Sequence, residues 1–192
     1  MTRDAPTRVT LYDSDELDAV IAAMARRAAA LIAGLEHVAV IGIRRRGAPL
    51  ADRLCASLSA HHNLPPPLRI DLDIKRYADD LSLLFPQTRL TEDPKHASVD
   101  LRGHTVVLVD DVLYSGHSLF TAIGHLLRRE PARIHVAVLA DRGVARLPIQ
   151  ADIVGVRLQV APDDIVECLV PPFEPIFGID VLRKGSAAAA AP

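Results

Sequence analysis

Apolar residues near the N-terminus recur every three or four positions, which is the period of an amphipathic helix. Asp13, with Glu16 three residues later, resembles the capping pair that begins many helices, and Gly34 suits the end of such a helix. We expect the apolar stripe of this helix to pack in the core and not to contact a cofactor. Its members are Leu17, Val20, Ile21, Met24, Ala28, Leu31 and Ile32.

Several later segments have the apolar content of strands. Continuous apolar runs, which are typical of strands buried on both faces, occupy residues 38–43, 106–109 and 134–140. Residues 68–74 alternate apolar and polar positions, which predicts a strand with one wetter face. Residues 153–158 and 165–170 are interpreted as later strands.

Helical patterns separate these strands, so the sequence predicts an α/β fold. One helix follows the first strand, with Pro49 near its first turn and an apolar face formed by Leu50, Leu54 and Leu58. Another is predicted from Ser118, as its cap, to about Arg129. Its expected apolar face consists of Leu119, Ile123, Leu126 and Leu127.

Length and composition predict one domain with a full core. The chain has 192 residues and a mass of 20.8 kDa, and 49% of its residues are hydrophobic. No internal repeat or linker divides it. We therefore expect a single domain over residues 1–184, followed by a low-complexity tail at 185–192.

Charge and cysteine usage narrow the class of protein further. A formal net charge of −2 gives no overall attraction to nucleic acid or acidic membranes, so any RNA contact requires a local basic patch. Cys55 and Cys168 are too few for a disulfide framework, and we expect both to be buried, inert thiols. The sequence has no apolar signal core and no apolar run long enough to span a bilayer. We expect a cytoplasmic protein without membrane contact.

The first candidate site is the end of the apolar run at 106–109. Asp110 and Asp111 follow it directly, at the end of a strand where ligands lie in open parallel sheets. The following loop, Ser115 to Ser118, offers backbone N–H groups and hydroxyls at a helix N-terminus, which is a cradle for an anion. Such a site would suit a ligand with both hydroxyls and a phosphate. A solvated acidic turn is the alternative interpretation.

A second candidate anion site follows the strand at 38–43. Three consecutive arginines, Arg44, Arg45 and Arg46, are closed by Gly47 at the expected C-terminal end of this strand. From the pattern alone, a solvated basic turn explains these residues equally well. A third feature is the long segment from Lys75 to about His104, which lacks periodicity and is either a functional loop or a disordered insertion.

The stretch 106–118 resembles the phosphoribosyl-pyrophosphate signature of type I phosphoribosyltransferases. Four further stretches, at 41–47, 77–82, 141–143 and 147–152, follow the order found in the PyrR family of pyrimidine operon regulators with uracil phosphoribosyltransferase activity. The resemblance covers about residues 10 to 170. It implies a central, mostly parallel sheet flanked by helices, with a flexible hood over the active site near residues 75–104.

The resemblance also implies a reaction and a homo-oligomer, which is common in the family. Phosphoribosyl pyrophosphate and uracil would give UMP and pyrophosphate, with Mg²⁺ as cofactor. Asp110 and Asp111 would hold the ribose hydroxyls directly or through Mg²⁺. Arg44 to Gly47 would form the pyrophosphate loop, in which Arg46 matches the family directly and Arg45 replaces a threonine. The other substrate-binding residues implied are Val112, Leu113, Tyr114, Ser115, Gly116, His117, Ser118 and Arg142.

Several positions bear on which reaction or partner the chain serves. Tyr114 stands where purine-salvage enzymes carry an aspartate, which is consistent with a pyrimidine acceptor. His117 replaces an arginine of the family, and a histidine carries less positive charge at neutral pH. Ala145 and Gln150 are uncharged where attenuator proteins carry arginines that contact RNA, although Arg146 and Arg157 could substitute in part.

Three functions therefore remain open. The first is an enzyme that makes UMP. The second is a nucleotide-sensing regulator that binds pyrimidine operon leader RNA and has vestigial catalysis. The third is a phosphoribosyltransferase for another base, because residues 159–166, near the expected acceptor site, depart from the family pattern.

Overall fold

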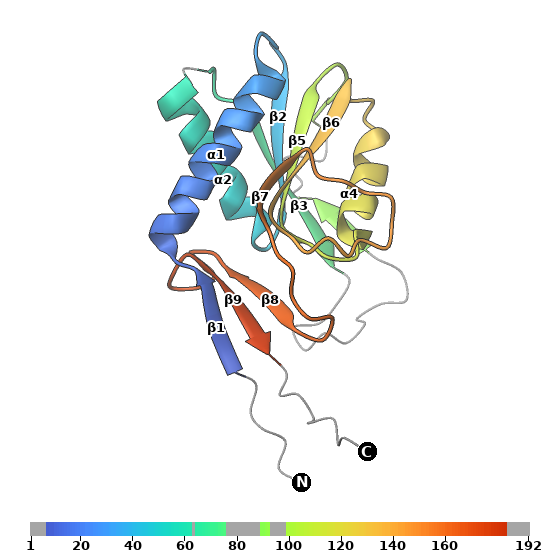
Figure 1. The fold of residues 1–192 in the computed structure, drawn as a ribbon. Coiled ribbons are helices and arrows are strands. Elements are labelled where there is room, and N and C mark those ends of the chain that lie inside the picture. The colour runs from blue at the N-terminus through green and yellow to red at the C-terminus, as the bar shows by residue number, and fades with distance from the viewer. Residues whose placement is uncertain (1–6, 63, 76–88, 93–98, 184–192) are drawn as a thin grey trace, which may run out of the picture.

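A six-stranded sheet forms the centre of the computed structural model, which describes residues 7–62, 64–75, 89–92 and 99–183 (Figure 1). Its strand order is β4-β3-β2-β5-β6-β7. Neighbours from β3 to β7 are parallel, whereas β4 is antiparallel to β3. The strands are β2 (Val38–Arg44), β3 (Leu68–Lys75), β4 (Arg89–Glu92), β5 (Thr105–Leu113), β6 (Arg133–Asp141) and β7 (Ile153–Arg157).

A second, three-stranded antiparallel sheet lies at one end of the central sheet (Figure 1). Its order is β1-β9-β8, with β1 at Thr7–Tyr12, β8 at Ile165–Leu169 and β9 at Gly178–Arg183. Thr7 pairs with Arg183, so the sheet brings the two ends of the described chain together. The sequence pattern predicted β8 but neither β1 nor β9.

Helices cover both faces of the central sheet (Figure 1). Buried residues of α1 (Ser14–Ile32) and α2 (Gly47–His62) pack with alternate strand residues such as Val40, Val107 and Leu139. Buried residues of α4 (His117–Leu127) pack on the other face with Ile41 and Leu108. Successive strand residues point to opposite faces of the sheet. Each continuous apolar run therefore contributes side chains to the core on both faces.

The start of α1 confirms the capping pair. The Asp13 side chain accepts a hydrogen bond from the backbone N–H of Glu16, and the Glu16 side chain accepts one from the N–H of Asp13, each at 3.0 Å. These two bonds satisfy N–H groups that a helix terminus otherwise leaves unpaired. None of the helices among the described residues combines the length and apolar character needed to cross a membrane.

The start and end of α4 correct two expectations. Gly116, not Ser118, is the N-cap residue, and its backbone is left-handed at φ 84°. Ser118 therefore lies inside the first turn, because a glycine at 116 can reverse the chain without a side-chain cap. The helix ends at Leu127, which is 59% exposed and does not belong to the apolar face. The buried face consists of Leu119, Ala122 and Leu126.

The connections of the central sheet diverge between β2 and β5. From β2 the chain crosses through α2 to β3 on one side, whereas from β5 it crosses through α4 to β6 on the other. In open α/β sheets, this divergence leaves a crevice at the carboxyl ends of the two strands, which is where ligands bind. The fold thus places the loops that follow β2 and β5 beside each other.

Three sequence expectations lie wholly or partly outside the described residues. They are the 77–82 stretch, the tail at 185–192 and most of the predicted hood, of which only 75, 89–92 and 99–104 are described. Within that segment, β4 pairs with β3 from Leu72 to Lys75.

Candidate functional site

The two aspartates lie in the last part of β5, where that strand extends beyond β2. Pairing of β2 with β5 ends at Gly42 and Val109, whereas pairing with β6 continues to Leu113. The strand therefore does not end at Asp110 and Asp111, as the apolar pattern suggested. The acids instead border the crevice, because β2 no longer covers that edge.

Burial dominates the electrostatics of the aspartates. Asp110 is only 8% exposed, and burial together with the neighbouring charge of Asp111 holds its pKa well above the ordinary value of 3.8. Burial also raises the pKa of Asp111, although the Arg46 guanidinium opposes this shift. One oxygen of each carboxylate accepts a backbone N–H at 2.9 Å, from Asp111 and Val112 respectively.

The arginine loop, defined here as residues 44–47, packs directly on β5. A Cβ atom added to Gly47 would lie 2.5 Å from the carbonyl oxygen of Val109 and 3.1 Å from the Cα of Asp110. Only glycine allows this approach without moving backbone atoms. The contact brings Nη1 of Arg46 to 3.9 Å from Oδ2 of Asp111.

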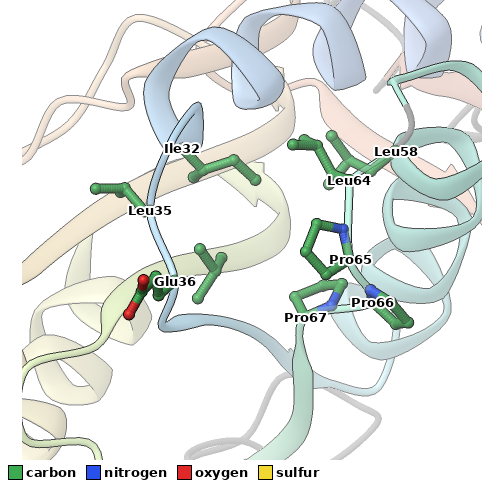
Figure 2. Close-up of a pocket in the computed structure, with 9 residues that line it drawn as sticks. Ile32, Leu35, Glu36, Leu58, Leu64, Pro65, Pro66 and Pro67 are labelled. Atoms are coloured by element: carbon green, nitrogen blue, oxygen red, sulfur yellow. The ribbon is translucent and has the colours of Figure 1, made fainter.

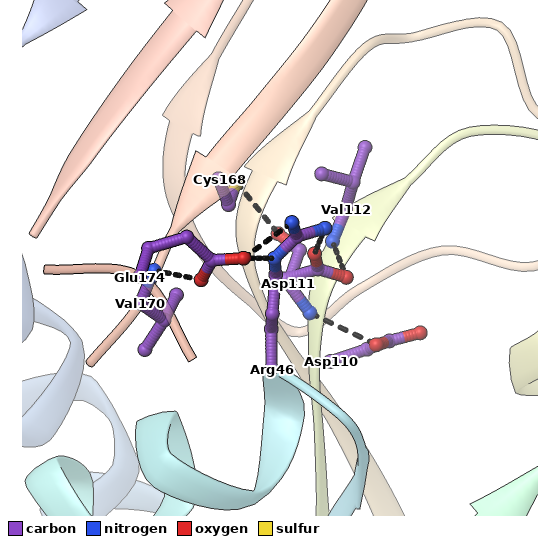
Figure 3. A network of polar contacts seen from close by, with 7 residues as sticks. All are labelled: Arg46, Asp110, Asp111, Val112, Cys168, Val170 and Glu174. Carbon is purple, nitrogen blue, oxygen red and sulfur yellow. Dashed lines mark hydrogen bonds and ion pairs between the residues drawn. The ribbon is translucent and has the colours of Figure 1, made fainter. Parts of the chain in front are cut away.

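A carboxylate from a distant part of the chain completes this cluster (Figure 3). Oε1 of Glu174 accepts hydrogen bonds from Nη2 and Nε of Arg46, at 2.6 and 3.1 Å. Glu174 lies in the connection between β8 and β9, 128 positions from Arg46. Burial alone would lower the pKa of Arg46, but the Glu174 bond and the nearby charges outweigh it and raise that pKa. Burial is likewise outweighed at Glu174, whose pKa is lowered by hydrogen bonds from Arg46 and Val170.

The other two arginines of the loop point elsewhere. Arg44 forms an ion pair with Asp71 of β3, in which Nε lies 3.6 Å from Oδ2. The Arg45 guanidinium lies 5.2 Å from the centre of the Phe173 ring, which also belongs to the β8–β9 connection. The structure therefore brings Arg46 to the aspartates and places Arg44 and Arg45 around it.

The second loop, which we define as residues 114–118 and call the phosphate loop, is stabilised by nearby groups. Nδ1 of His117 lies 2.9 Å from Oγ of Ser115, and the Ser115 carbonyl accepts the N–H of Arg146 at 3.1 Å. Gly116 is buried against the side chains of Leu147 and Ile149. The loop leads directly into the N-terminus of α4, where unpaired N–H groups favour an anion.

Arg142 lies beside Tyr114, the first residue of the phosphate loop. The Arg142 guanidinium is 4.6 Å from the centre of the half-exposed Tyr114 ring, and the Arg142 N–H donates to the carbonyl of Leu113. Next to them is an open, mostly polar hollow. Its lining includes Leu113, Asp141, Gly143, Ala145, Gln150 and Arg157.

The carboxylates suit a magnesium ion that arrives with its substrate. Among the described residues, no group of three histidine, cysteine or acidic side chains could enclose a metal. Mg²⁺, however, commonly uses one or two carboxylates and takes its remaining oxygens from water and substrate phosphates. The adjacent Asp110 and Asp111 fit that mode of binding, and ionisation of these buried acids would be favoured by a cation.

A small pocket lies at the amino ends of β2 and β3, opposite to the candidate site (Figure 2). It forms where β2 and β3 begin, and its lining is apolar apart from Glu36. The residues around it include Ile32, Leu58, Leu64, Pro65 and Pro66. Because it has neither the acids nor the arginines, its chemistry does not suit a phosphorylated ligand.

The two cysteines are free, and both thiols are hard to ionise. Burial raises the pKa of Cys55 to about 11 and that of Cys168 well above its ordinary range. Cys168 lies beneath the site, with its sulfur 3.8 Å from the Asp111 carbonyl oxygen. Phe173 and Glu174 were not among the residues predicted for the site, because their Pro-Pro-Phe-Glu-Pro stretch carries no sequence signal for a contact with the arginine loop.

Comparison with known proteins agrees with this geometry. Residues 10–174 match the phosphoribosyl transferase domain family. The chain is 42% identical over 157 residues to the Bifunctional protein PyrR of Roseiflexus sp., covering 80% of this chain and 83% of that protein. Identity to the Bifunctional protein PyrR of Chloroflexus aurantiacus is 37% over 182 residues, covering 92% and 96%.

The fold also matches a solved structure. The hypoxanthine phosphoribosyl transferase of Trypanosoma cruzi superposes with a TM-score of 0.74 at 21% identity, covering 95% of this chain and 94% of that one. The type I phosphoribosyltransferase fold expected from the sequence is thereby confirmed. Because the identity to these two PyrR proteins extends over most of the chain, the chain belongs to the PyrR family of phosphoribosyltransferases.

Proposed function

We propose that the crevice transfers the phosphoribosyl group of phosphoribosyl pyrophosphate to uracil, giving UMP and pyrophosphate. The observation that carries this proposal is the approach of Arg46, in the arginine loop, to Asp111, in the last part of β5, at 3.9 Å. The Arg46 guanidinium, which can bind phosphate oxygens, thus lies beside carboxylates that can bind sugar hydroxyls. The N-terminus of α4, which follows the same strand as the carboxylates, can bind a second anion. A ligand that satisfies all three carries a ribose between two phosphate groups.

The phosphate loop would hold the 5′-phosphate. Its backbone N–H groups and the hydroxyls of Ser115 and Ser118 are donors, and the α4 dipole favours negative charge at this end. His117 can add a further donor.

The aspartates would fix the ribose and stabilise the positive charge that develops on it. Their burial strengthens such interactions, since fixed charges act more strongly away from water. When bound, Mg²⁺ would neutralise pyrophosphate charge as it leaves, with Asp110 and Asp111 as its protein ligands. Arg46 and Arg45 would bind the pyrophosphate, while Arg44, paired with Asp71, would lie at the edge.

The acceptor would enter beside Tyr114 and Arg142. One uracil ring nitrogen would form the new bond to the anomeric carbon while the bond to pyrophosphate breaks, and its proton would pass to solvent or pyrophosphate. Tyr114 would face the ring where purine-salvage enzymes have an aspartate. Positioning and charge stabilisation are sufficient for this step, so no covalent enzyme intermediate is needed.

A panel of bases tests the proposal. The folded protein is incubated with Mg²⁺, phosphoribosyl pyrophosphate and labelled uracil, hypoxanthine or orotate, and the nucleotides are separated. We expect UMP from uracil and little product from the other two bases. Turnover of hypoxanthine or orotate without turnover of uracil would contradict the pyrimidine assignment.

We also propose a second function, nucleotide-dependent binding of pyrimidine operon leader RNA. The observation that favours it is that relatives which align over most of their length are named bifunctional. The hollow beside the phosphate loop is lined by Ala145, Gln150 and Arg157, so Arg157 and the nearby Arg146 would supply its positive charge. Filter binding with and without UMP tests this function. We expect UMP-dependent retention at low salt, and retention that UMP does not change would exclude it.

A further inference from the structure

The connection between β8 and β9, residues 170–177, contacts the arginine loop at two consecutive positions. Phe173 lies under the Arg45 guanidinium, and Glu174 binds Arg46. The connection belongs to the small sheet, so its contacts join that sheet to the crevice. Nothing in the proposed chemistry requires either residue to touch the substrate.

Glu174 is itself held in place by the backbone. The N–H groups of Phe173 and Glu174 donate to the Val170 carbonyl at 3.1 and 3.3 Å, which closes a tight turn. The Val170 N–H in turn donates to Oε2 of Glu174 at 2.8 Å. One carboxylate oxygen is thus tied to the turn, while the other receives both bonds from Arg46 (Figure 3).

This arrangement uses one edge of the Arg46 guanidinium. Nε and Nη2 face Glu174, whereas Nη1 faces Asp111 at 3.9 Å, which is an ion-pair distance beyond hydrogen-bond range. Without Glu174, the guanidinium would be drawn toward the nearest carboxylate, Asp111. It would then occupy the oxygen that the ribose or its metal ion needs.

We propose that Glu174 is a positioning residue that keeps Arg46 oriented toward pyrophosphate and away from Asp111. This inference rests on the proposed function, in which Arg46 binds the leaving pyrophosphate. An arginine side chain loses rotamer freedom when it binds a ligand, and one that is already fixed loses less. Glu174, which remains ionised because its pKa is lowered, supplies this restraint in the free protein.

A double-mutant cycle tests the inference. The variants are Glu174→Ala, Arg46→Ala and the double variant, each assayed for uracil turnover with phosphoribosyl pyrophosphate varied. Loss of hydrogen bonds between charged groups predicts that Glu174→Ala raises the KM for phosphoribosyl pyrophosphate about tenfold. The KM for uracil should stay close to that of the parent protein. In the double variant, removal of Glu174 should add no further loss to that of Arg46→Ala.

Two more variants separate positioning from a structural role. Glu174→Gln replaces one of the two carboxylate oxygens with an NH2 donor, so it loses either the Arg46 bonds or the Val170 bond, and an intermediate KM is expected. Glu167→Ala is the matched control, because Glu167 lies on β8, on the face opposite to that of Cys168, and pairs with Arg8 at 2.9 Å. It should leave both KM values unchanged. Thermal melting of each variant shows whether it is folded, and Glu174→Gln replaces Glu174→Ala in the cycle if the alanine variant is not.

The outcomes distinguish this inference from the proposed function. If Arg46→Ala raises the KM for phosphoribosyl pyrophosphate but folded Glu174 variants do not, Glu174 does not position Arg46. Additive losses in the double variant would also overturn the inference, because Glu174 would then act independently of Arg46. If the folded parent protein neither turns over uracil nor binds phosphoribosyl pyrophosphate, the proposed function itself fails.

Discussion

The phosphate loop and the arginine loop follow adjacent parallel strands, yet they are held in different ways. The phosphate loop combines a contact within itself, between His117 and Ser115, with contacts to the segment 146–149, which follows β6. The arginine loop depends on Gly47 packed against β5 and on Glu174, 128 positions away. One half of the crevice is therefore held within the β5–α4–β6 unit and the segment that follows it, whereas the other depends on a contact with the small sheet.

This difference predicts how the two halves respond to substitution. Changes in the phosphate loop should act on that loop alone. The arginine loop should also respond to changes in the small sheet, because the β8–β9 connection supports both Arg45 and Arg46. The aspartates between the loops belong to both halves of the site.

Removing the charge of Asp111, which the two halves share, should have the largest effect. Asp111→Asn should lower the rate of UMP formation roughly 100-fold or more, because the partly buried carboxylate that would stabilise the developing positive charge is lost. Initial rates with labelled uracil measure this effect. Asp15→Asn, at an exposed position in the first turn of α1, is the control and should be close to the parent. Equal rates for the two variants would remove Asp111 from the site.

Two glycine substitutions test whether the arginine loop depends on its contact with β5. Gly47→Ala should lower the free energy of unfolding by about 2 kcal/mol or more, since the new Cβ would lie 2.5 Å from the Val109 carbonyl oxygen. Gly124→Ala, within α4 with nothing near the new atom, should raise it by roughly 0.5–1 kcal/mol. Urea denaturation measures both. Equal and small changes would show that the loop tolerates a looser contact.

Ionisation of Asp110 should limit the stability of the free protein. Burial raises the pKa of Asp110, so ionisation costs more in the folded than in the unfolded chain. The stability linked to this carboxyl is full below its ordinary pKa of 3.8 and is lost as the pH rises through the raised value. Asp110→Asn cannot ionise and should melt a few degrees higher at neutral pH, where about 1 kcal/mol corresponds to roughly 2–4 °C.

Measuring the parent protein and Asp110→Asn over a range of pH provides the control. The difference in melting temperature between Asp110→Asn and the parent should shrink as the pH falls toward 3.8, because the parent carboxyl then becomes protonated. An asparagine oxygen can still accept the Asp111 N–H, so the local hydrogen bond is retained. A difference that is constant with pH would show that ionisation is not its cause.

A substitution in the phosphate loop should have the smallest effect. His117→Arg should lower the KM for phosphoribosyl pyrophosphate a few-fold, since arginine binds phosphate through charged, bidentate hydrogen bonds. Because the contacts described for this loop do not include Glu174, the change should be additive with that of Glu174→Ala on a free-energy scale. Strong non-additivity would show that the two halves of the crevice are coupled.

The same division explains how much could be predicted from sequence. A buried strand, two acids and a glycine-containing loop are contiguous at 106–118, so their pattern and family resemblance predicted the local site, and the Asp13–Glu16 pair predicted the start of α1. Glu174 and Phe173 could not be predicted, because their contacts exist only after the small sheet has formed. Strands β1 and β9 escaped prediction for a similar reason, since each is short and pairs with the opposite end of the chain.

The predicted cap of α4 was wrong for a different physical reason. Ser118 has the side chain that commonly caps helices, but Gly116 lies two positions earlier and adopts a left-handed backbone at φ 84°. The helix therefore begins before the serine. The conformational freedom of Gly116 determined the start of the helix, and not the capping preference of Ser118. A sequence pattern alone does not show which of the two decides.

Formation of UMP tests the central claim most directly. The parent protein, confirmed as folded by thermal melting, is mixed with Mg²⁺, phosphoribosyl pyrophosphate and labelled uracil, and both products are quantified. We predict UMP and pyrophosphate in equal amounts, with no UMP when phosphoribosyl pyrophosphate is left out. A folded protein that forms no UMP under these conditions would contradict the assignment of the crevice to uracil phosphoribosyl transfer.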